Sequence, residues 1–176
     1  MIRTMKNSKK FVAVLMGSDS DLDIMKHTVD VLDKMSIPRE VRITSAHRTP
    51  EATHDYVKNA DKRGCAVFIA AAGLAAHLAG SIAGITVKPV IGVPIDGGSL
   101  GGMDALLSTV QMPAGIPVAC VAIGKAGAKN AAYLAAQILA LSNEAISTAL
   151  IEERADNARI IAEKNKSLDE LNAKSS

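Results

Sequence analysis

The sequence predicts a doubly wound α/β protein, a three-layer α/β/α sandwich built on a parallel sheet of about five strands. Two observations predict it. Short, continuous apolar runs recur along the chain, which is typical of parallel strands whose two faces are both covered. Between these runs lie stretches whose apolar residues are three or four positions apart, the period of an amphipathic helix. A sheet of this kind binds its ligand beyond the carboxyl ends of its strands.

Strands and helices alternate in order along the chain. The apolar runs predict strands at 11–16, 41–44, 66–71, 89–93 and 117–123. The periodic stretches predict helices at 20–35, 50–63, 75–83, 103–110 and 128–141. The second helix has the clearest limits, because Pro50 suits the first helical position and Gly64 follows the last residue. This alternation is that of a flavodoxin-like fold.

One domain and one extra C-terminal helix account for the 176 residues. We expect a disordered segment at 1–10, an α/β catalytic domain at 11–142, and a C-terminal helix and tail at 143–176. Apolar residues spaced among charged ones between 144 and 171 predict one long amphipathic helix without a place in the sheet. This helix can pack on its own domain or on a neighbouring subunit. We expect it to pack on a neighbouring subunit of an oligomer.

Composition narrows the range of partners. The net charge of +2 comes from 20 basic and 18 acidic residues, a balance that does not predict nucleic-acid binding. We expect no secretory signal, because no apolar segment follows the basic N-terminal residues, and the longest apolar runs are about half the ~20 residues that cross a bilayer. Cys65 and Cys120 are isolated, which suits a reducing cytoplasm. Aromatic residues make up only 2%, so we expect no aromatic side chain to be essential for ligand binding.

The loop after the first strand, Gly-Ser-Asp-Ser-Asp at 17–21, is rich in polar side chains. One Ser or Asp can cap the following helix, which leaves the others unexplained. Amides and hydroxyls at a helix start bind phosphate or carboxylate, so Ser18 and Ser20 are candidate ligand-binding residues. Asp19 and Asp21 would repel a phosphate placed directly on them, so at least one of the two is better suited to hold hydroxyls or an amine.

The loop after the second strand is Ser-Ala-His-Arg-Thr-Pro at 45–50. Histidine is the side chain best suited to carry a proton near neutral pH, so His47 is a candidate proton carrier. Arg48 offers a planar fork for phosphate or carboxylate. Ser45 or Thr49 can alternatively cap the helix that begins at Pro50.

The third and fourth strands also end in loops of small residues. Gly73 lets the backbone approach a ligand closely, although tight helix–sheet packing explains the neighbouring alanines equally well. His77 falls inside the predicted third helix, so we expect it to be buried and hydrogen-bonded. Four glycines between 97 and 102 predict a mobile loop, and their spacing excludes a dinucleotide fingerprint.

Five motifs, in this order and spacing, resemble the PurE family of N5-carboxyaminoimidazole ribonucleotide mutases: GSDSD, SAHRTP, AGLAAHLAG, QMPAGIPVA and AIGKAGAKNAA. The resemblance covers about residues 11–141. It implies a cytoplasmic isomerase of purine biosynthesis that assembles as a homo-octamer. It also implies that a carboxylate moves from the exocyclic amine of the imidazole ribonucleotide to the neighbouring ring carbon, without metal, ATP or organic cofactor.

The resemblance implies roles for individual residues. His47 matches the family's catalytic histidine, the general acid and base. Substrate-binding positions are matched by Ser18, Asp21 and Arg48, while other residues fall in the same motifs, namely Ser20, Ser45 and Gly73. The chain departs from the family pattern at three positions where Trp, Gly and Pro are common, namely Leu22, Leu74 and Ala79, and its 97–102 segment is richer in glycine than usual.

Two other functions remain open at this point. A sister class with the same fold carboxylates aminoimidazole ribonucleotide directly with carbon dioxide, although SAHRTP together with GLAAHLAG resembles the mutase class more closely. A non-catalytic nucleotide-binding module explains the sheet and the Gly17 loop. It does not explain why His47 stands beside Arg48.

Overall fold

The computed structural model describes residues 10–173, apart from the side chains of Glu170, Leu171 and Ala173. The predicted disordered segment at 1–10 therefore lies, except for Lys10, outside the described residues. The strands are β1 (Phe11–Met16), β2 (Arg39–Ile43), β3 (Cys65–Gly73), β4 (Val90–Ile95) and β5 (Ala119–Cys120). The helices are η1 (Asp19–Asp21, a 3-10 turn), α1 (Leu22–Lys34), α2 (Pro50–Arg63), α3 (Leu78–Ala83), α4 (Met103–Val110), α5 (Gly124–Ala140) and α6 (Glu144–Ala173).

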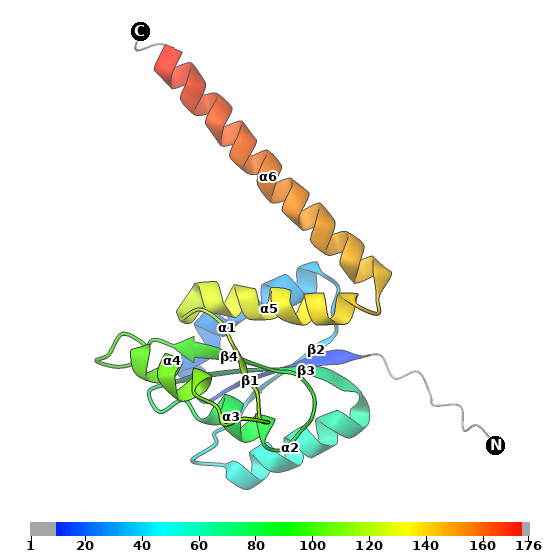
Figure 1. Cartoon of the computed structure of the whole chain (residues 1–176), viewed down its shortest axis with the longest axis vertical. Coiled ribbons are helices and arrows are strands. Elements are labelled where there is room, and N and C mark those ends of the chain that lie inside the picture. The colour runs from blue at the N-terminus through cyan, green and yellow to red at the C-terminus, as the bar shows by residue number, and fades with distance from the viewer. Residues whose placement is uncertain (1–9, 174–176) are drawn as a thin grey trace, which may run out of the picture. The chain divides into compact units, whose positions relative to one another are not determined.

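All neighbouring strands pair in parallel, in the order β2-β1-β3-β4-β5. Helices cover both faces, with α1 and α5 on one side of the sheet and α2 and α3 on the other (Figure 1). This confirms the predicted flavodoxin-like α/β fold. The chain leaves β1 toward β2 on one side and returns to β3 on the other, so the topological switch point lies between β1 and β3. Ligand sites in open α/β sheets form at such a point.

The core of the sheet is made of small and branched residues. Every residue of β1 and β4 is buried. Phe68 and Leu15 are completely buried on the face that α2 and α3 cover, in the same cluster as Ile82. On the opposite face the Thr28 hydroxyl of α1 donates to the Ala128 carbonyl of α5 at 2.8 Å. The central strands are therefore held in place by packing on both faces of the sheet.

The predicted element limits differ from the structure most clearly at β5 and α3. The run 117–123 yields only a two-residue strand, because β5 is an edge strand that begins after Pro117 and the chain turns at Gly124, where φ is +68°. Helix α3 begins at Leu78, three residues later than predicted, because Leu74 adopts a φ of +55° and redirects the chain after β3.

The chain forms two compact units, one ending at Ala136 and one beginning at Gln137. The first holds the sheet and its helices, and the second holds the end of α5 together with α6. The predicted boundary between 142 and 143 stays a prediction. Within residues 10–173, no helix is both long and apolar enough to cross a membrane.

A charged cluster ties α2 to the edge strand β2, at the end of the strand away from the switch point. The buried Tyr56 hydroxyl donates to Glu40 Oε2 at 3.0 Å, and Arg63 Nη2 donates to the same oxygen at 2.8 Å. The Arg63 guanidinium holds the pKa of the Glu40 carboxyl below its ordinary value. The cluster therefore joins two elements through one carboxylate.

Replacing Tyr56 by phenylalanine should lower the free energy of unfolding by about 1 kcal/mol, because the buried hydroxyl loses its bond to a carboxylate that Arg63 still binds. Urea denaturation of both proteins measures the difference. Ligand binding should not change, since the cluster lies at the start of β2. An unchanged denaturation midpoint would show that the hydroxyl contributes nothing to stability.

Candidate active site

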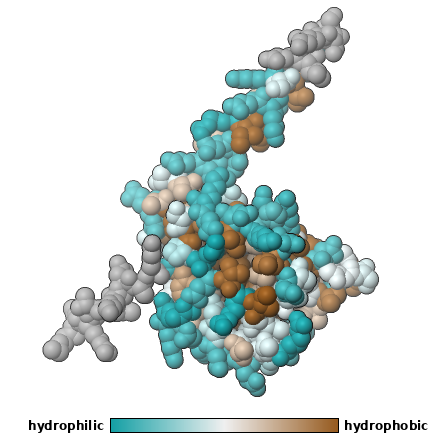
Figure 2. All heavy atoms as spheres, turned by 180° about the vertical axis from the view of Figure 1, so that it is seen from behind, coloured by the Kyte–Doolittle hydropathy of each residue, from teal (hydrophilic) through white to brown (hydrophobic). Residues whose placement is uncertain are grey.

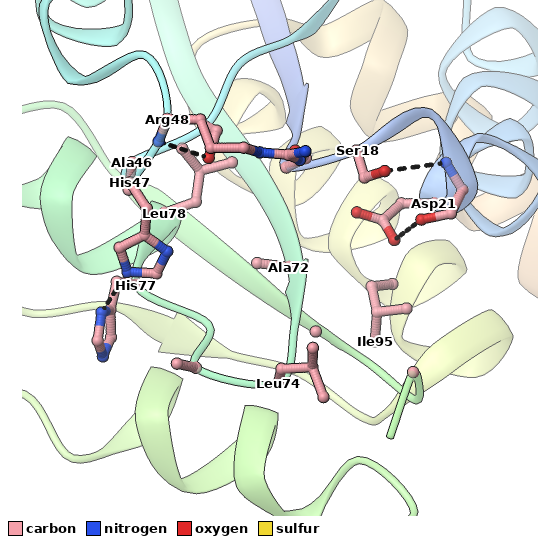
Figure 3. A pocket seen from close by; sticks show the side chains of 16 residues that line it. Ser18, Asp21, Ala46, His47, Arg48, Ala72, Leu74, His77, Leu78 and Ile95 are labelled. Atoms are coloured by element: carbon pink, nitrogen blue, oxygen red, sulfur yellow. Dashed lines mark hydrogen bonds between the residues drawn. The ribbon is translucent and has the colours of Figure 1, made fainter.

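A pocket of about 520 Å³ lies beyond the carboxyl ends of β1, β2 and β3 (Figure 3). Its volume is in the range of small-molecule sites. All seven residues named from the sequence line it: Ser18, Ser20, Asp21, Ser45, His47, Arg48 and Gly73. They come from three loops that are distant in sequence. The parallel sheet brings these loops together because it places all its carboxyl ends on one edge.

The loop after β1 supplies hydroxyls and one carboxylate. Ser18 caps the 3-10 turn, since its Oγ accepts a hydrogen bond from the Ser20 amide at 3.3 Å. The Ser20 hydroxyl donates to Asp21 Oδ1 at 3.3 Å. Asp21 is buried, and burial raises the pKa of its carboxyl above the ordinary value, while the bond from Ser20 opposes part of that shift. Its carboxylate is thus held at the inner end of the loop.

Hydrogen bonds of threonine hydroxyls restrain the loop after β2. Thr44 and Thr53 hydroxyls lie 2.7 Å apart, and the Thr49 hydroxyl accepts from the Ser45 amide at 3.0 Å. Thr49 is the residue before α2, but its side chain bonds within the loop rather than capping the helix. The Ser45 hydroxyl accepts from the Arg48 amide at 3.1 Å. These hydrogen bonds restrain the part of the loop that carries His47 and Arg48.

Arg48 joins two of the three loops. Its Nη2 donates to the Gly17 carbonyl at 3.0 Å, across the carboxyl ends of β2 and β1. The guanidinium has five N–H donors, so this single bond orients the group and leaves donors for an anionic ligand. In Figure 3 its side chain extends toward Ser18. A cation and two hydroxyls thus lie at the same end of the pocket.

His47 and His77 form a direct imidazole pair. His47 Nε2 lies 2.8 Å from His77 Nδ1, and the two rings meet edge to face with centroids 4.9 Å apart. One nitrogen must donate and the other accept, so a single proton lies between the rings. Both side chains are exposed and line the pocket. The pair can give a proton to a ligand and take one back.

The prediction that His77 is buried inside a helix is wrong. Because α3 begins at Leu78, His77 is the residue before the helix, and its side chain is exposed toward His47. Sequence reasoning missed it as a site residue. The signal that could have found it was its place within the AGLAAHLAG motif, between a strand end and a helix start.

Small and aliphatic residues form the rest of the pocket. Gly73 ends β3, and a Cβ atom there would lie 3.1 Å from the Ile95 carbonyl of β4, a close contact that glycine avoids. Among the described residues, neither Phe nor Tyr lines the pocket. A ligand here is contacted by imidazole, guanidinium, hydroxyl and backbone groups. The residues that sequence reasoning did not assign to the site are Ala46, Ala72, Leu74, Ala75, His77, Leu78, Ile95 and Gly97.

Between residues 10 and 173, His, Cys, Asp and Glu side chains do not gather in threes in a way that would hold a metal ion. Burial raises the pKa of the Cys65 thiol to about 12, so this residue stays a protonated, apolar group. The candidate reactive groups of the pocket are therefore His47, His77 and Asp21.

Replacing His77 by alanine should lower turnover about tenfold and leave the Michaelis constant nearly unchanged, because His47 loses the partner that orients its ring. Replacement by asparagine should restore part of the rate, since its amide can make the same hydrogen bond. Steady-state kinetics of both variants measure this split. Equal losses in the two variants would mean that the hydrogen bond has no part in turnover.

Replacing Asp21 by asparagine should raise the stability of the ligand-free protein at pH 7 and weaken ligand binding. The folded-state pKa of Asp21 lies above the unfolded value, so burying the charged carboxylate costs stability at neutral pH. That cost disappears as the pH falls through the raised pKa, and so should the advantage of the variant. Thermal unfolding at several pH values measures this. A variant less stable than wild type at pH 7 would contradict the expectation.

The fold and the pocket define a doubly wound α/β protein with a small-molecule site at its topological switch point, which presents imidazole, guanidinium and hydroxyl groups among small and aliphatic residues. Residues 11–160 match the model of the AIR carboxylase family, and the chain belongs to that family. The N5-carboxyaminoimidazole ribonucleotide mutase of Pyrococcus horikoshii is 51% identical over 97% of this chain and 96% of its own length. The protein of that name from Bacillus subtilis is 49% identical over 89% of this chain and 97% of its own.

A solved structure agrees with this assignment. The crystal structure of PurE from Treponema denticola is 32% identical and superposes with a TM-score of 0.82, covering 90% of this chain and 98% of that one. The resemblance found in the five sequence motifs is thereby confirmed at the level of the family.

Proposed function

We propose that the chain is an isomerase of purine biosynthesis that converts N5-carboxyaminoimidazole ribonucleotide into 4-carboxyaminoimidazole ribonucleotide. The observation that carries this proposal is the His47–His77 pair, set beside Arg48 and the serines of the β1 loop, in a chain about half identical to relatives with that name. The ligand such a site suits is small and anionic, with a group that needs a proton.

The chemistry needs one proton carrier. His47 protonates the carbamate nitrogen, the bond from nitrogen to the carboxyl carbon breaks with its electron pair staying on nitrogen, and carbon dioxide leaves. The electron-rich ring carbon then attacks carbon dioxide and forms a carbon–carbon bond. This carbon still bears its proton, and returning that proton to His47 restores the aromatic ring. The sum is an isomerisation that consumes no other reactant.

The remaining pocket residues bind the substrate. Arg48 and the hydroxyls of Ser18, Ser20 and Ser45 hold its anionic groups, and Asp21 accepts hydrogen bonds from its hydroxyls or amine. The Gly73 backbone lets the ring approach the strand ends. Stacking on aromatic rings has no part in this arrangement, in agreement with the composition of the pocket.

Conversion of the purified carbamate tests the proposal. The chain, with a chelator present and ATP absent, should form the 4-carboxy product from the carbamate faster than from aminoimidazole ribonucleotide with bicarbonate. The opposite order would favour direct carboxylation, the second candidate, which the name of the family model supports. Tight binding of either ribonucleotide without turnover would instead favour a non-catalytic binding module.

We also propose that the chain works as a homo-octamer in the cytoplasm. Figure 2 shows apolar side chains gathered on the surface of the α/β unit. Exposed apolar residues on and next to α4 support a subunit contact, namely Leu100, Met103, Leu107 and Val110. Light scattering of the purified chain measures the assembly, and a monomer at micromolar concentration would contradict it.

A further inference from the structure

Leu74 has a backbone conformation that its residue type rarely adopts. Its φ is +55°, and among the described non-glycine residues only Ser36 shares a positive φ. For a residue with a bulky side chain the left-handed region costs about 1 kcal/mol or more. Leu74 follows β3 directly and lines the pocket. Leu74 therefore keeps an unfavourable backbone conformation at the edge of the pocket.

The Leu74 side chain lies on the backbone of Gly98. A Cβ atom built on Gly98 would be 2.5 Å from Leu74 Cδ2, so the leucine occupies the space that a side chain at position 98 would need. The Leu74 side chain is 54% exposed, so it packs on the loop at the surface and is not part of the buried core. The strained conformation is what directs this side chain across the strand end toward the loop.

The loop between β4 and α4 is packed at its far end, where a Cβ atom on Gly102 would lie 2.7 Å from Ile123 Cγ2, and is open nearer the pocket. Gly97 and Gly101 have open space where a side chain would be, and Gly101 and Gly102 adopt φ values of +58° and +79°. Gly97 lines the pocket, so the position of the loop decides how far the pocket opens to solvent. Leu74 therefore contacts the loop at Gly98, the neighbour of Gly97, which lines the pocket.

We propose that Leu74 is a positioning residue, which holds the 96–102 loop at the mouth of the pocket through its contact with Gly98 and thereby retains carbon dioxide until the ring carbon recaptures it. The retention step rests on the proposed function, in which carbon dioxide is free for a moment inside the pocket. A closed, dry site favours recapture over escape. The holding of the loop rests on the structure alone.

The first experiment measures the loop without any assay of activity. Leu74→Gly removes the side chain and also relieves the strain, since glycine adopts this conformation freely, so the variant should fold. Hydrogen exchange, followed by mass spectrometry of peptides that span 96–102, should be about three- to tenfold faster than in wild type. Leu74→Met, whose side chain still reaches Gly98, is the matched control and should exchange like wild type. Equal exchange in Leu74→Gly and wild type overturns the proposal.

The second experiment measures retention as a ratio that does not depend on rate. The substrate carries ¹³C in its carbamate carboxyl, and the buffer holds unlabelled carbon dioxide and bicarbonate. With spontaneous decay in an enzyme-free sample subtracted, Leu74→Gly should give several-fold more aminoimidazole ribonucleotide and unlabelled product than wild type or Leu74→Met. Label retention equal to that of wild type overturns the retention step.

A reciprocal pair separates the contact from a general weakening of the loop. Gly98→Ala alone should push the flexible end of the Leu74 side chain off the loop and so free the loop, because its new Cβ would lie 2.5 Å from Leu74 Cδ2. In the Leu74→Gly background there is no side chain to displace. The two changes together should therefore have a smaller effect on exchange than the sum of each alone, and strict additivity contradicts the contact. If wild type forms no carboxylated product while Leu74→Gly still speeds exchange, the proposed function and its retention step fall, but the holding of the loop stands.

Discussion

Replacing His47 by asparagine should lower the rate of carboxylate migration by about 10²- to 10⁴-fold, because the substrate loses the group that gives and takes back its proton. Asparagine keeps a polar side chain of similar length but does not titrate. His47 is exposed, and its ring bonds to His77 rather than to the core, so its loss removes little packing. Circular dichroism and light scattering should match wild type while product formation falls.

His54→Asn is the matched control for this loss. His54 is an exposed histidine of α2, does not line the pocket, and undergoes the same chemical change. Its variant should convert the carbamate at the wild-type rate. A His47→Asn protein with nearly the wild-type rate would contradict the assigned role, and His77 would then be the next residue to test.

The fold and the convergence of the site loops could be predicted because their signals are local. Pro50 and Gly64 mark both ends of α2, and the structure begins and ends this helix at the predicted residues. The apolar runs of β1 and β3 identify two buried strands, and because these strands pair in parallel, the loops that follow them leave the sheet at the same edge. Parallel pairing then brings His47, Ser18 and Gly73 to one pocket without further information from the sequence.

What could not be predicted depends on backbone angles and on contacts between distant loops. The late start of α3 follows from the left-handed conformation of Leu74, which its residue type does not suggest. That shift turns His77 from an expected helix-interior residue into the partner of His47. The length of β5 likewise depends on a distant segment, because an edge strand extends only as far as it pairs, and only two residues of β5 pair with β4.

Replacing Arg48 by methionine should raise the Michaelis constant about 10- to 100-fold and change turnover much less, because charge-assisted hydrogen bonds to an anionic substrate contribute about 1.5–3 kcal/mol. Methionine keeps the length of the side chain and removes the fork. The bond to the Gly17 carbonyl is also lost, so the loops after β1 and β2 are no longer joined. Arg48→Lys should recover part of the affinity, since it restores the charge but not the paired donors.

Titration calorimetry with the 4-carboxy product checks that this change lies in binding rather than in a kinetic step. Arg42→Met is the matched control, because Arg42 is exposed on β2 and stacks on the Tyr56 ring away from the pocket. It should leave the dissociation constant unchanged. If the Arg48→Met and wild-type proteins bound product equally, the guanidinium would serve only to join the two loops, and the substrate's anionic groups would depend on the serine hydroxyls and backbone amides alone.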